Sequence, residues 1–296
     1  GWKYSPERID FDLRLKGQEQ TVAFDVTPPK GQSEGIVVAI AKVGGRSYDR
    51  SLVRIEYDHI PTQTLFPKAS ANVVKIDLKR KGQNVGYLMG AGDEIPASLR
   101  QIGYDVWEMD DEDVTAQNLS ELDALIVGVR AYNTRDRMKF HQEKLMEYVK
   151  NGGTMIVQYN TNRGLKVEDL GPYPFTVSRD RVTVEEAEVR IIDSKHPVMN
   201  SPNKITDKDF EGWVQERGLY FPNEWDANYQ AILSSNDPGE EARDGGLLVA
   251  QYGKGFYIYS GYSWFRELPA GVAGAYRIFT NLISLGNEDN APQSKK

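Results

Sequence analysis

The chain of 296 residues contains no cysteine and only three histidines, His59, His141 and His196. Without a thiol there can be no disulfide, no thiolate nucleophile and no zinc site built on thiolates. Three histidines also disfavour a metal site that depends on several imidazoles. We therefore predict neither a metal nor another cofactor.

A basic surplus and a long apolar run are missing as well. The formal net charge is −7, which argues against a general binder of nucleic acids or anionic membranes, because both need a net basic surface. No apolar run approaches the roughly 20 residues that cross a bilayer. The start at Gly1 has neither an initiator methionine nor the features of a signal peptide, so we expect a piece of a longer protein.

The chain contains enough hydrophobic residues to form more than one hydrophobic core. Hydrophobic residues make up 40% and charged residues 27%, and the length predicts two domains at roughly 150 residues each. The first region alternates polar and apolar residues, as half-buried strands do, over 8–15, 21–26 and 51–57, and it has an apolar run at 35–43. Short strands without intervening helices predict a small immunoglobulin-like β-sandwich over residues 1–80.

The pattern changes after residue 82. Strands are predicted at 84–89, 105–109, 122–129 and 154–159, with helices at 95–102 and 136–150 among them. A pair of strands at 246–252 and 255–259 and a helix at 272–285 follow. This alternation predicts an open, parallel α/β sheet of the flavodoxin type over residues 81–288, and the polar residues 289–296 are expected to be a disordered tail.

In such sheets, ligands bind beyond the carboxyl ends of the parallel strands. The predicted ends are rich in amides, arginines and aromatic rings, a mixture that suits a polyhydroxylated ligand such as a sugar. An equally open alternative is that the aromatic residues only cover this edge of the sheet. The candidate ligand-binding residues are Arg130, Tyr132, Asn133, Gln158, Tyr159, Asn160, Arg163, Tyr262, Trp264 and Arg266.

Several catalytic motifs are incomplete. Gly90-Ala91-Gly92 follows a strand, but the third glycine of a dinucleotide-binding loop would fall at Ile95, and Asp93-Glu94 would face a pyrophosphate. A nucleophile elbow needs a serine or cysteine between a strand and a helix. The turn that we predict for this role, 157–161, has neither.

His196 is the remaining candidate for acid–base chemistry. It precedes a proline in a predicted loop, where a histidine is more often structural, but with Asp93 or Glu94 it would form a catalytic set. A serine–histidine–aspartate triad would require an unusual chain order. The acidic residues Asp207, Asp209 and Glu211 do not fit a calcium-binding loop and are interpreted as a solvated face.

A set of segments resembles a known kind of protein region. The segments are NVGYLMGAGDE at 84–94, LDALIVGVRAYNT at 122–134, the Gly152-Gly153 pair, His196-Pro197 and YGKG at 252–255. Together they resemble the carboxyl-terminal region of long PIG-L/LmbE-type deacetylases of Bacteroidetes-like bacteria. That region is similar to ThuA-like proteins and to class I glutamine amidotransferases, and a β-sandwich precedes it.

The resemblance also implies that catalytic residues of the related enzymes are missing from this chain. The amidotransferase cysteine would stand at Tyr159 or Asn160, so glutaminase activity is not implied, and the histidine that ThuA-like proteins often place there is also missing. The zinc-binding His-Pro-Asp-Asp motif of the deacetylases does not occur, so any deacetylase domain would lie upstream as a partner within the same chain. The implied location is periplasmic or extracellular.

Three functions follow as expectations. The first is a non-catalytic accessory region that binds carbohydrate, and the second is a ThuA-like sugar-active enzyme that uses His196 with strand-end carboxylates. The third is a scaffold that docks the deacetylase domain or a second copy of the chain, which leaves a homo-oligomer open.

Overall fold

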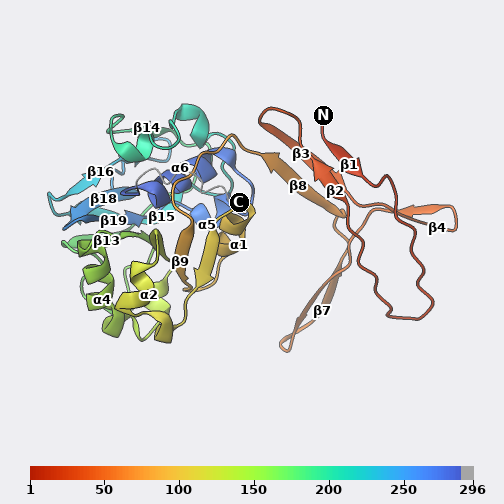
Figure 1. Cartoon of the computed structure of the whole chain (residues 1–296), viewed down its shortest axis with the longest axis horizontal. Coiled ribbons are helices and arrows are strands. Elements are labelled where there is room, and N and C mark those ends of the chain that lie inside the picture. The colour runs from red at the N-terminus through yellow and green to blue at the C-terminus, as the bar shows by residue number, and fades with distance from the viewer. Residues whose placement is uncertain (288–296) are drawn as a thin grey trace, which may run out of the picture. The chain divides into compact units, whose positions relative to one another are not determined.

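The computed structural model describes residues 1–287, which belong to two compact units, 1–77 and 78 onwards. The boundary predicted from the sequence was 80/81. The predicted disordered tail, 289–296, lies outside the described residues. Figure 1 shows the elements of both units along the chain.

Unit 1 consists of short antiparallel pairs. Its strands are β1 (Lys3–Ser5), β2 (Asp25–Thr27), β3 (Ser33–Val38), β4 (Ala41–Val43), β5 (Arg46–Tyr48), β6 (Val53–Tyr57), β7 (Ile60–Leu65) and β8 (Ser70–Lys75). They form four separate two-stranded sheets, β1-β2, β3-β8, β4-β5 and β6-β7. The structure therefore does not show the predicted immunoglobulin-like sandwich, and the predicted strand at 8–15 is irregular.

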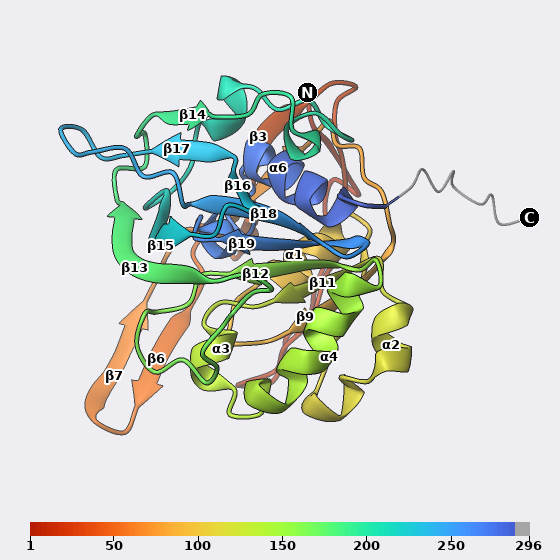
Figure 2. The same ribbon diagram turned by 90° about the vertical axis from the view of Figure 1, so that its left-hand side faces the viewer.

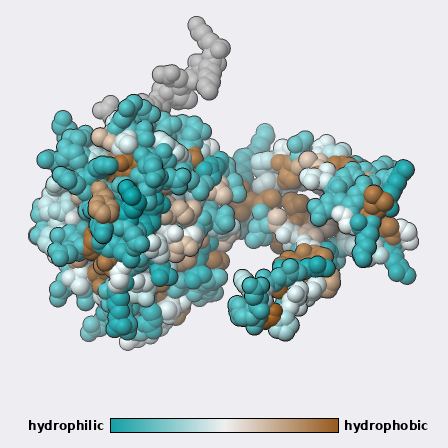
Figure 3. Space-filling model, turned by 90° about the horizontal axis from the view of Figure 1, so that it is seen from below, coloured by the Kyte–Doolittle hydropathy of each residue, from teal (hydrophilic) through white to brown (hydrophobic). Residues whose placement is uncertain are grey.

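The reason lies in burial. A sandwich packs the inner faces of two sheets against each other, but no residue of unit 1 is buried. All six side chains of β7 are exposed, for example. Figure 3 shows apolar residues in brown on the surface of this unit. The alternating pattern at 51–57 corresponds to β6, whereas 8–15 and most of 21–26 are irregular. Alternation also cannot report whether a second sheet covers the apolar side.

Unit 2 contains a seven-stranded sheet in the order β10-β9-β11-β12-β19-β18-β16. Its strands are β9 (Asn84–Leu88), β10 (Asp105–Glu108), β11 (Ala124–Val127), β12 (Thr154–Gln158), β16 (Tyr229–Ala231), β18 (Leu247–Tyr252) and β19 (Gly255–Ser260). The first five in this order are parallel, whereas β18 and β16 are antiparallel to their neighbours. Numbered along the chain, the parallel strands have the order 2-1-3-4-5, which is the flavodoxin-like arrangement. The prediction of an open, parallel α/β sheet is confirmed for these five strands, and the two antiparallel strands make the whole sheet mixed.

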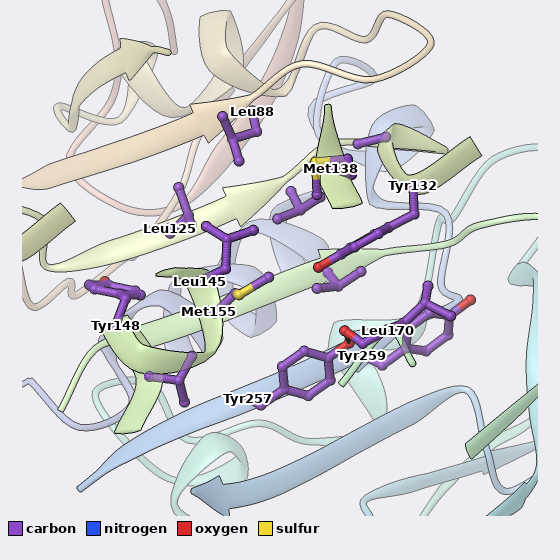
Figure 4. Close-up of a cluster of buried hydrophobic side chains, with 14 of the residues drawn as sticks. Leu88, Leu125, Tyr132, Met138, Leu145, Tyr148, Met155, Leu170, Tyr257 and Tyr259 are labelled. Atoms are coloured by element: carbon purple, nitrogen blue, oxygen red, sulfur yellow. Dashed lines mark hydrogen bonds between the residues drawn. The ribbon is translucent and has the colours of Figure 1, made fainter. Parts of the chain in front are cut away.

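Helices cover both faces of this sheet. They are α1 (Ile95–Gln101), α2 (Ala116–Ser120), α3 (Ala131–Thr134), α4 (Met138–Lys150), α5 (Trp264–Glu267) and α6 (Ala273–Ser284). Figure 2 shows α4 and α6 on opposite sides of the sheet. Because both faces are covered, β11 and β12 are buried at every position. β11 is apolar throughout, and β12 is apolar at its three central residues, between Thr154 and Gln158. The core under α4 joins Leu125, Leu145 and Met155 to the rings of Tyr132 and Tyr257 (Figure 4).

The segment between β12 and β19 was largely unassigned in the sequence. It forms β13 (Phe175–Val182), β14 (Val189–Ile191), β15 (Gly218–Trp225) and β17 (Leu233–Ser235), which pair as β13-β15 and β14-β17. Three short 3-10 helices also occur in unit 2: η1 (Asp111–Asp113), η2 (Pro197–Met199) and η3 (Asp207–Phe210). Register shifts between β13 and β15 break the two-residue period, so the sequence carries only a weak strand signal there. No helix within residues 1–287 is long and apolar enough to cross a membrane.

Candidate functional site at the carboxyl ends of β9, β11 and β12

The loops after β9 and β11 meet at the point where the strand order reverses. The Ala91 amide donates to the carbonyl of Val129 at 2.8 Å, and the Gly128 amide donates to the carbonyl of Leu88 at 2.8 Å. A Cβ atom on Gly90 would lie 2.1 Å from the Val129 oxygen. This close approach of two backbones explains why a glycine stands directly after the first strand. It is also the place where open α/β sheets bind ligands.

Arg130 occupies a left-handed turn at this point. It lies between β11 and α3 with φ 58° and ψ 20°, and its amide donates to the carbonyl of Tyr159 at 2.8 Å. The sharp strand-to-helix turn of unit 2 is therefore at Arg130. The prediction that such a turn follows Thr154–Tyr159 is wrong, because β12 leads into an irregular loop. The side chain at the turn is a guanidinium, which cannot act as a nucleophile.

Next to this turn, a network of side-chain hydrogen bonds links β12 to β9 and to the loop that follows β9. The Gln158 amide nitrogen donates to the Tyr87 hydroxyl at 2.9 Å, and that hydroxyl lies 2.6 Å from both carboxyl oxygens of Asp93. The Ile95 amide also donates to Asp93, at 3.1 Å. Burial raises the pKa of Asp93 above its usual value and raises the pKa of Tyr87 further. This network of hydrogen bonds therefore holds the Asp93 carboxyl in place, while burial favours the neutral form of that carboxyl.

Aromatic rings gather beside Arg130. The ring of Tyr159 stacks on Tyr220 at 5.9 Å between centroids and lies 5.4 Å from the ring of Phe265. The Arg266 guanidinium lies 4.9 Å from the centre of the Phe265 ring and pairs with Glu216 at 2.8 Å. Burial raises the pKa of Tyr159, and the positive charges of Arg130 and Arg266 oppose that shift. Three half-buried rings and two arginines thus border one part of the edge.

The ten candidate ligand-binding residues fall into two groups. Five of them are fully buried and bond within the protein: Tyr132, Gln158, Asn160, Tyr262 and Trp264. In this conformation their side chains stabilise this end of the sheet, as expected from the alternative that such residues only cover it. The other five retain exposed surface: Arg130, Asn133, Tyr159, Arg163 and Arg266.

Among the more exposed five, Asn133 has a positioning role. Its amide nitrogen donates to the carbonyls of Thr161 and Arg163, and its oxygen accepts from the Thr161 amide. These bonds tie the loop after β12 to α3. The sequence reasoning missed Tyr220 and Phe265. Tyr220 lies in the segment that was left unassigned, whereas Phe265 lies between two predicted site residues, Trp264 and Arg266.

The acid–base set proposed around His196 is not assembled by any contact in residues 1–287. His196 is 8% exposed at the start of η2, where its Nδ1 accepts from the Val198 amide at 3.3 Å. Burial lowers its pKa, and Asp193 opposes this. No hydrogen bond or ion pair in the described part of the chain joins it to Asp93 or Glu94.

The acidic residues 207–211 are not uniformly solvated. Asp207 and Glu211 are exposed, but Asp209 is buried, accepts from Thr206 and pairs with Arg277 at 2.7 Å. It joins η3 to α6 and is therefore structural. Within the described residues, no group of three or more histidine, aspartate or glutamate side chains is placed to hold a metal ion.

The contact at Gly90 leads to a first prediction. Gly90→Ala should destabilise unit 2 by about 2–3 kcal/mol, because the added carbon would force the loop after β9 away from the turn at Arg130. The free energy of unfolding in urea measures this change. Gly92→Ala is the matched control: its site has open space, so only the positive φ of 102° costs energy, about 1 kcal/mol. Equal losses in the two variants would contradict the steric interpretation.

Comparison with known proteins shows no family for this chain. No family model matches the chain, and no curated protein matches it. Solved structures with a similar backbone include a Thermoplasma acidophilum protein described as part of GMP synthase, with 10% identity and a TM-score of 0.45 over 70% of this chain and 96% of that one. A protein from Bacteroides uniformis described as ThuA-like has 14% identity and a TM-score of 0.46 over 72% and 95%.

A β-galactosidase from Rahnella sp. R3 is also similar, with 14% identity and a TM-score of 0.43 over 69% of this chain and 31% of that enzyme. None of the three is described as a deacetylase. Similarity at this level concerns the arrangement of the backbone and carries no statement about ligand or activity. The chain has an α/β fold with a mixed, mostly parallel sheet, similar to amidotransferase-like and ThuA-like structures.

Proposed function

We propose that unit 2 is a non-catalytic carbohydrate-binding region that accompanies a PIG-L/LmbE-type de-N-acetylase domain in an exported protein. The observation that carries the non-catalytic part is the left-handed turn after β11, where a guanidinium stands in place of a nucleophile. The nearby carboxyl of Asp93 is bonded to Tyr87 and to backbone, and no serine or threonine hydroxyl is hydrogen-bonded to it in the described residues.

The carbohydrate part is supported by the side chains that border the same edge. Tyr159, Tyr220 and Phe265 are half-buried, so each presents some ring surface, and aromatic faces pack well on the apolar faces of sugar rings. Arg130 and the Tyr159 hydroxyl add hydrogen-bonding groups that have no partner within residues 1–287. The set offers stacking and hydrogen bonding without a group placed for bond cleavage.

Tyr159→Ala should weaken binding of chitotetraose, a neutral amino-sugar tetrasaccharide, by about tenfold, because it removes the central ring of the aromatic group. Isothermal titration calorimetry on the full chain measures the affinity. Tyr252→Ala is the matched control. This tyrosine is also half-buried and packs on another ring, Tyr173, at 5.8 Å, but it ends β18 at the opposite edge of the sheet. Loss of affinity in both variants, or no binding by the unaltered chain, would refute a sugar site at this edge.

A docking role for unit 1 is a second candidate, and one observation favours it. Most of the large apolar side chains that are exposed in the described chain belong to residues 1–77, including Leu15 at 75% and Ile36 at 70%. Surfaces of this kind mark protein–protein contacts. Sedimentation analysis should show self-association of the full chain and a monomer for residues 78–296. A monomeric full chain would argue against a role in self-association.

A further inference from the structure

The arginines at and near the candidate site differ in whether their side chains have hydrogen-bond or ion-pair partners. Arg266 pairs with Glu216 and also bonds to Gln215, so its positive charge is already compensated. Arg135, after α3, is held by Asp111 and by the carbonyl of Met89. Arg130 differs from both, because no hydrogen bond or ion pair engages any nitrogen of its guanidinium among the described residues; its Nε is buried without a partner, as is the Nε of Arg135.

The backbone keeps this unsatisfied guanidinium beside the aromatic rings. The hydrogen bond of 2.8 Å from the Arg130 amide to the Tyr159 carbonyl joins the ends of β11 and β12. The left-handed conformation of Arg130 is unusual for a residue with a side chain, and it is maintained by the surrounding bonds. A cation in this position has lost part of its hydration and has no anion to replace it. A bound anion would supply the hydrogen-bond acceptors and the negative charge that the protein does not provide to this guanidinium.

The acidic groups nearby do not compensate Arg130. Glu216 forms an ion pair with Arg266, and Glu94 is exposed to water, where its charge is screened. Asp93 is bonded to Tyr87 and to the Ile95 amide. Because burial raises the pKa of Asp93, its carboxyl opposes an incoming anion less than an ordinary aspartate would. The chain as a whole carries −7, so its overall field does not attract anions, and any affinity for them must come from a local group.

We propose that the carbohydrate bound at this edge is acidic, with its carboxylate on the Arg130 guanidinium and its ring against Tyr159. This inference rests on the proposed carbohydrate-binding function and names the class of sugar, a uronic acid. A guanidinium presents two parallel N–H groups that match the two oxygens of a carboxylate. Arg130 is the one guanidinium of these three without a partner, so the site suits one carboxylate rather than a densely charged chain.

The test compares two tetrasaccharides by calorimetry with the full chain. One alternates N-acetylglucosamine and glucuronic acid, and the other is chitotetraose, which has no carboxylate. We expect the acidic sugar to bind at least about tenfold more tightly at low salt. Arg130→Gln should remove that advantage, so that the affinity falls much further for the acidic sugar than for chitotetraose. Arg130→Lys should retain part of it, because the charge remains while the paired N–H geometry is lost.

Arg179→Gln is the matched control, since Arg179 is an exposed arginine of β13 and the substitution removes the same charge. It should leave both affinities unchanged. Equal binding of the two tetrasaccharides, or equal losses for both in Arg130→Gln, would overturn the acidic-sugar inference while carbohydrate binding stands. Binding of neither sugar would overturn the proposed function as well. Tighter binding of a sulfated galactose tetrasaccharide than of the glucuronic acid sugar would overturn the assignment to a carboxylate.

Discussion

Residues 1–77, produced as a separate polypeptide, are expected to show no cooperative unfolding transition. None of these residues is buried, and their strands form four two-stranded pairs. An isolated hairpin is at best marginally stable in water, because it buries too little apolar surface to offset the entropy of ordering its backbone. Outside the strand pairs, hydrogen bonds still join distant parts of the unit, for example from Trp2 to Ser33 and from the Ala69 amide to the Asp49 carbonyl, but they bury no side chain.

Residues 78–296 should behave in the opposite way. Their sheet is covered on both faces, and the buried apolar residues of the chain lie in this unit. We expect one cooperative thermal transition whose midpoint matches the main transition of the full chain. Circular dichroism and calorimetry of the two fragments and the full chain measure this. A sharp transition in the isolated residues 1–77 would show that the unit has a core of its own.

The second large effect concerns the pH dependence of stability through Glu267. This residue of α5 is completely buried; one of its oxygens accepts from the Val214 amide at 3.0 Å, and the other has no partner in the described structure. Burial raises the pKa of Glu267 to about 8, although the Arg217 charge opposes the shift. The folded state therefore keeps a proton that the unfolded chain has already lost above pH 4.5.

The sign of the effect follows from this difference in bound protons. Between about pH 4.5 and 8, the folded state binds more protons at Glu267 than the unfolded state, so the free energy of unfolding must fall as the pH rises. The contribution is fully present below pH 4.5 and is lost by about pH 8, with a total on the order of 5 kcal/mol. Above pH 8 this group makes no further difference to the slope.

Glu267→Gln should remove this dependence, since the amide stays neutral and its oxygen can still accept from Val214. We expect the variant to be more stable than the unaltered chain at pH 8.5 by a few kcal/mol, and to show a flatter curve from pH 5 to 8. Urea unfolding at several pH values measures both. Glu241→Gln, at an exposed position, controls for the loss of a charge. Parallel curves for the unaltered chain and Glu267→Gln would refute a raised pKa.

Much of the architecture of unit 2 could be predicted from local patterns. The apolar runs at 84–89 and 154–159 became β9 and β12, and the periodic segment 136–150 became α4 at 138–150. These patterns are reliable because a strand covered on both faces requires a mostly apolar segment, whereas a helix with one buried face requires apolar residues at a period of about 3.6. The edge of the sheet that carries the candidate site followed from the same reasoning.

The details of the site depended on contacts between distant residues. The sequence placed the sharp turn near Tyr159, whereas the structure has it at Arg130, where φ is positive and the preceding Val129 carbonyl lies against Gly90. Gly90 and Val129 come from different loops, so no local pattern predicts this contact. Similarly, Tyr220 joins the aromatic group from a strand whose register shifts hide its period.

The sequence by itself determined that the chain has no thiol, because it contains no cysteine, and that its formal net charge is −7. Only the tertiary structure decided which polar groups lack partners. Arg130 and Arg266 are the same residue type near the same edge, yet Arg266 has Glu216 and Arg130 has no such partner among the described residues. Pairing of this kind depends on side chains 50 positions apart, and no local pattern records it.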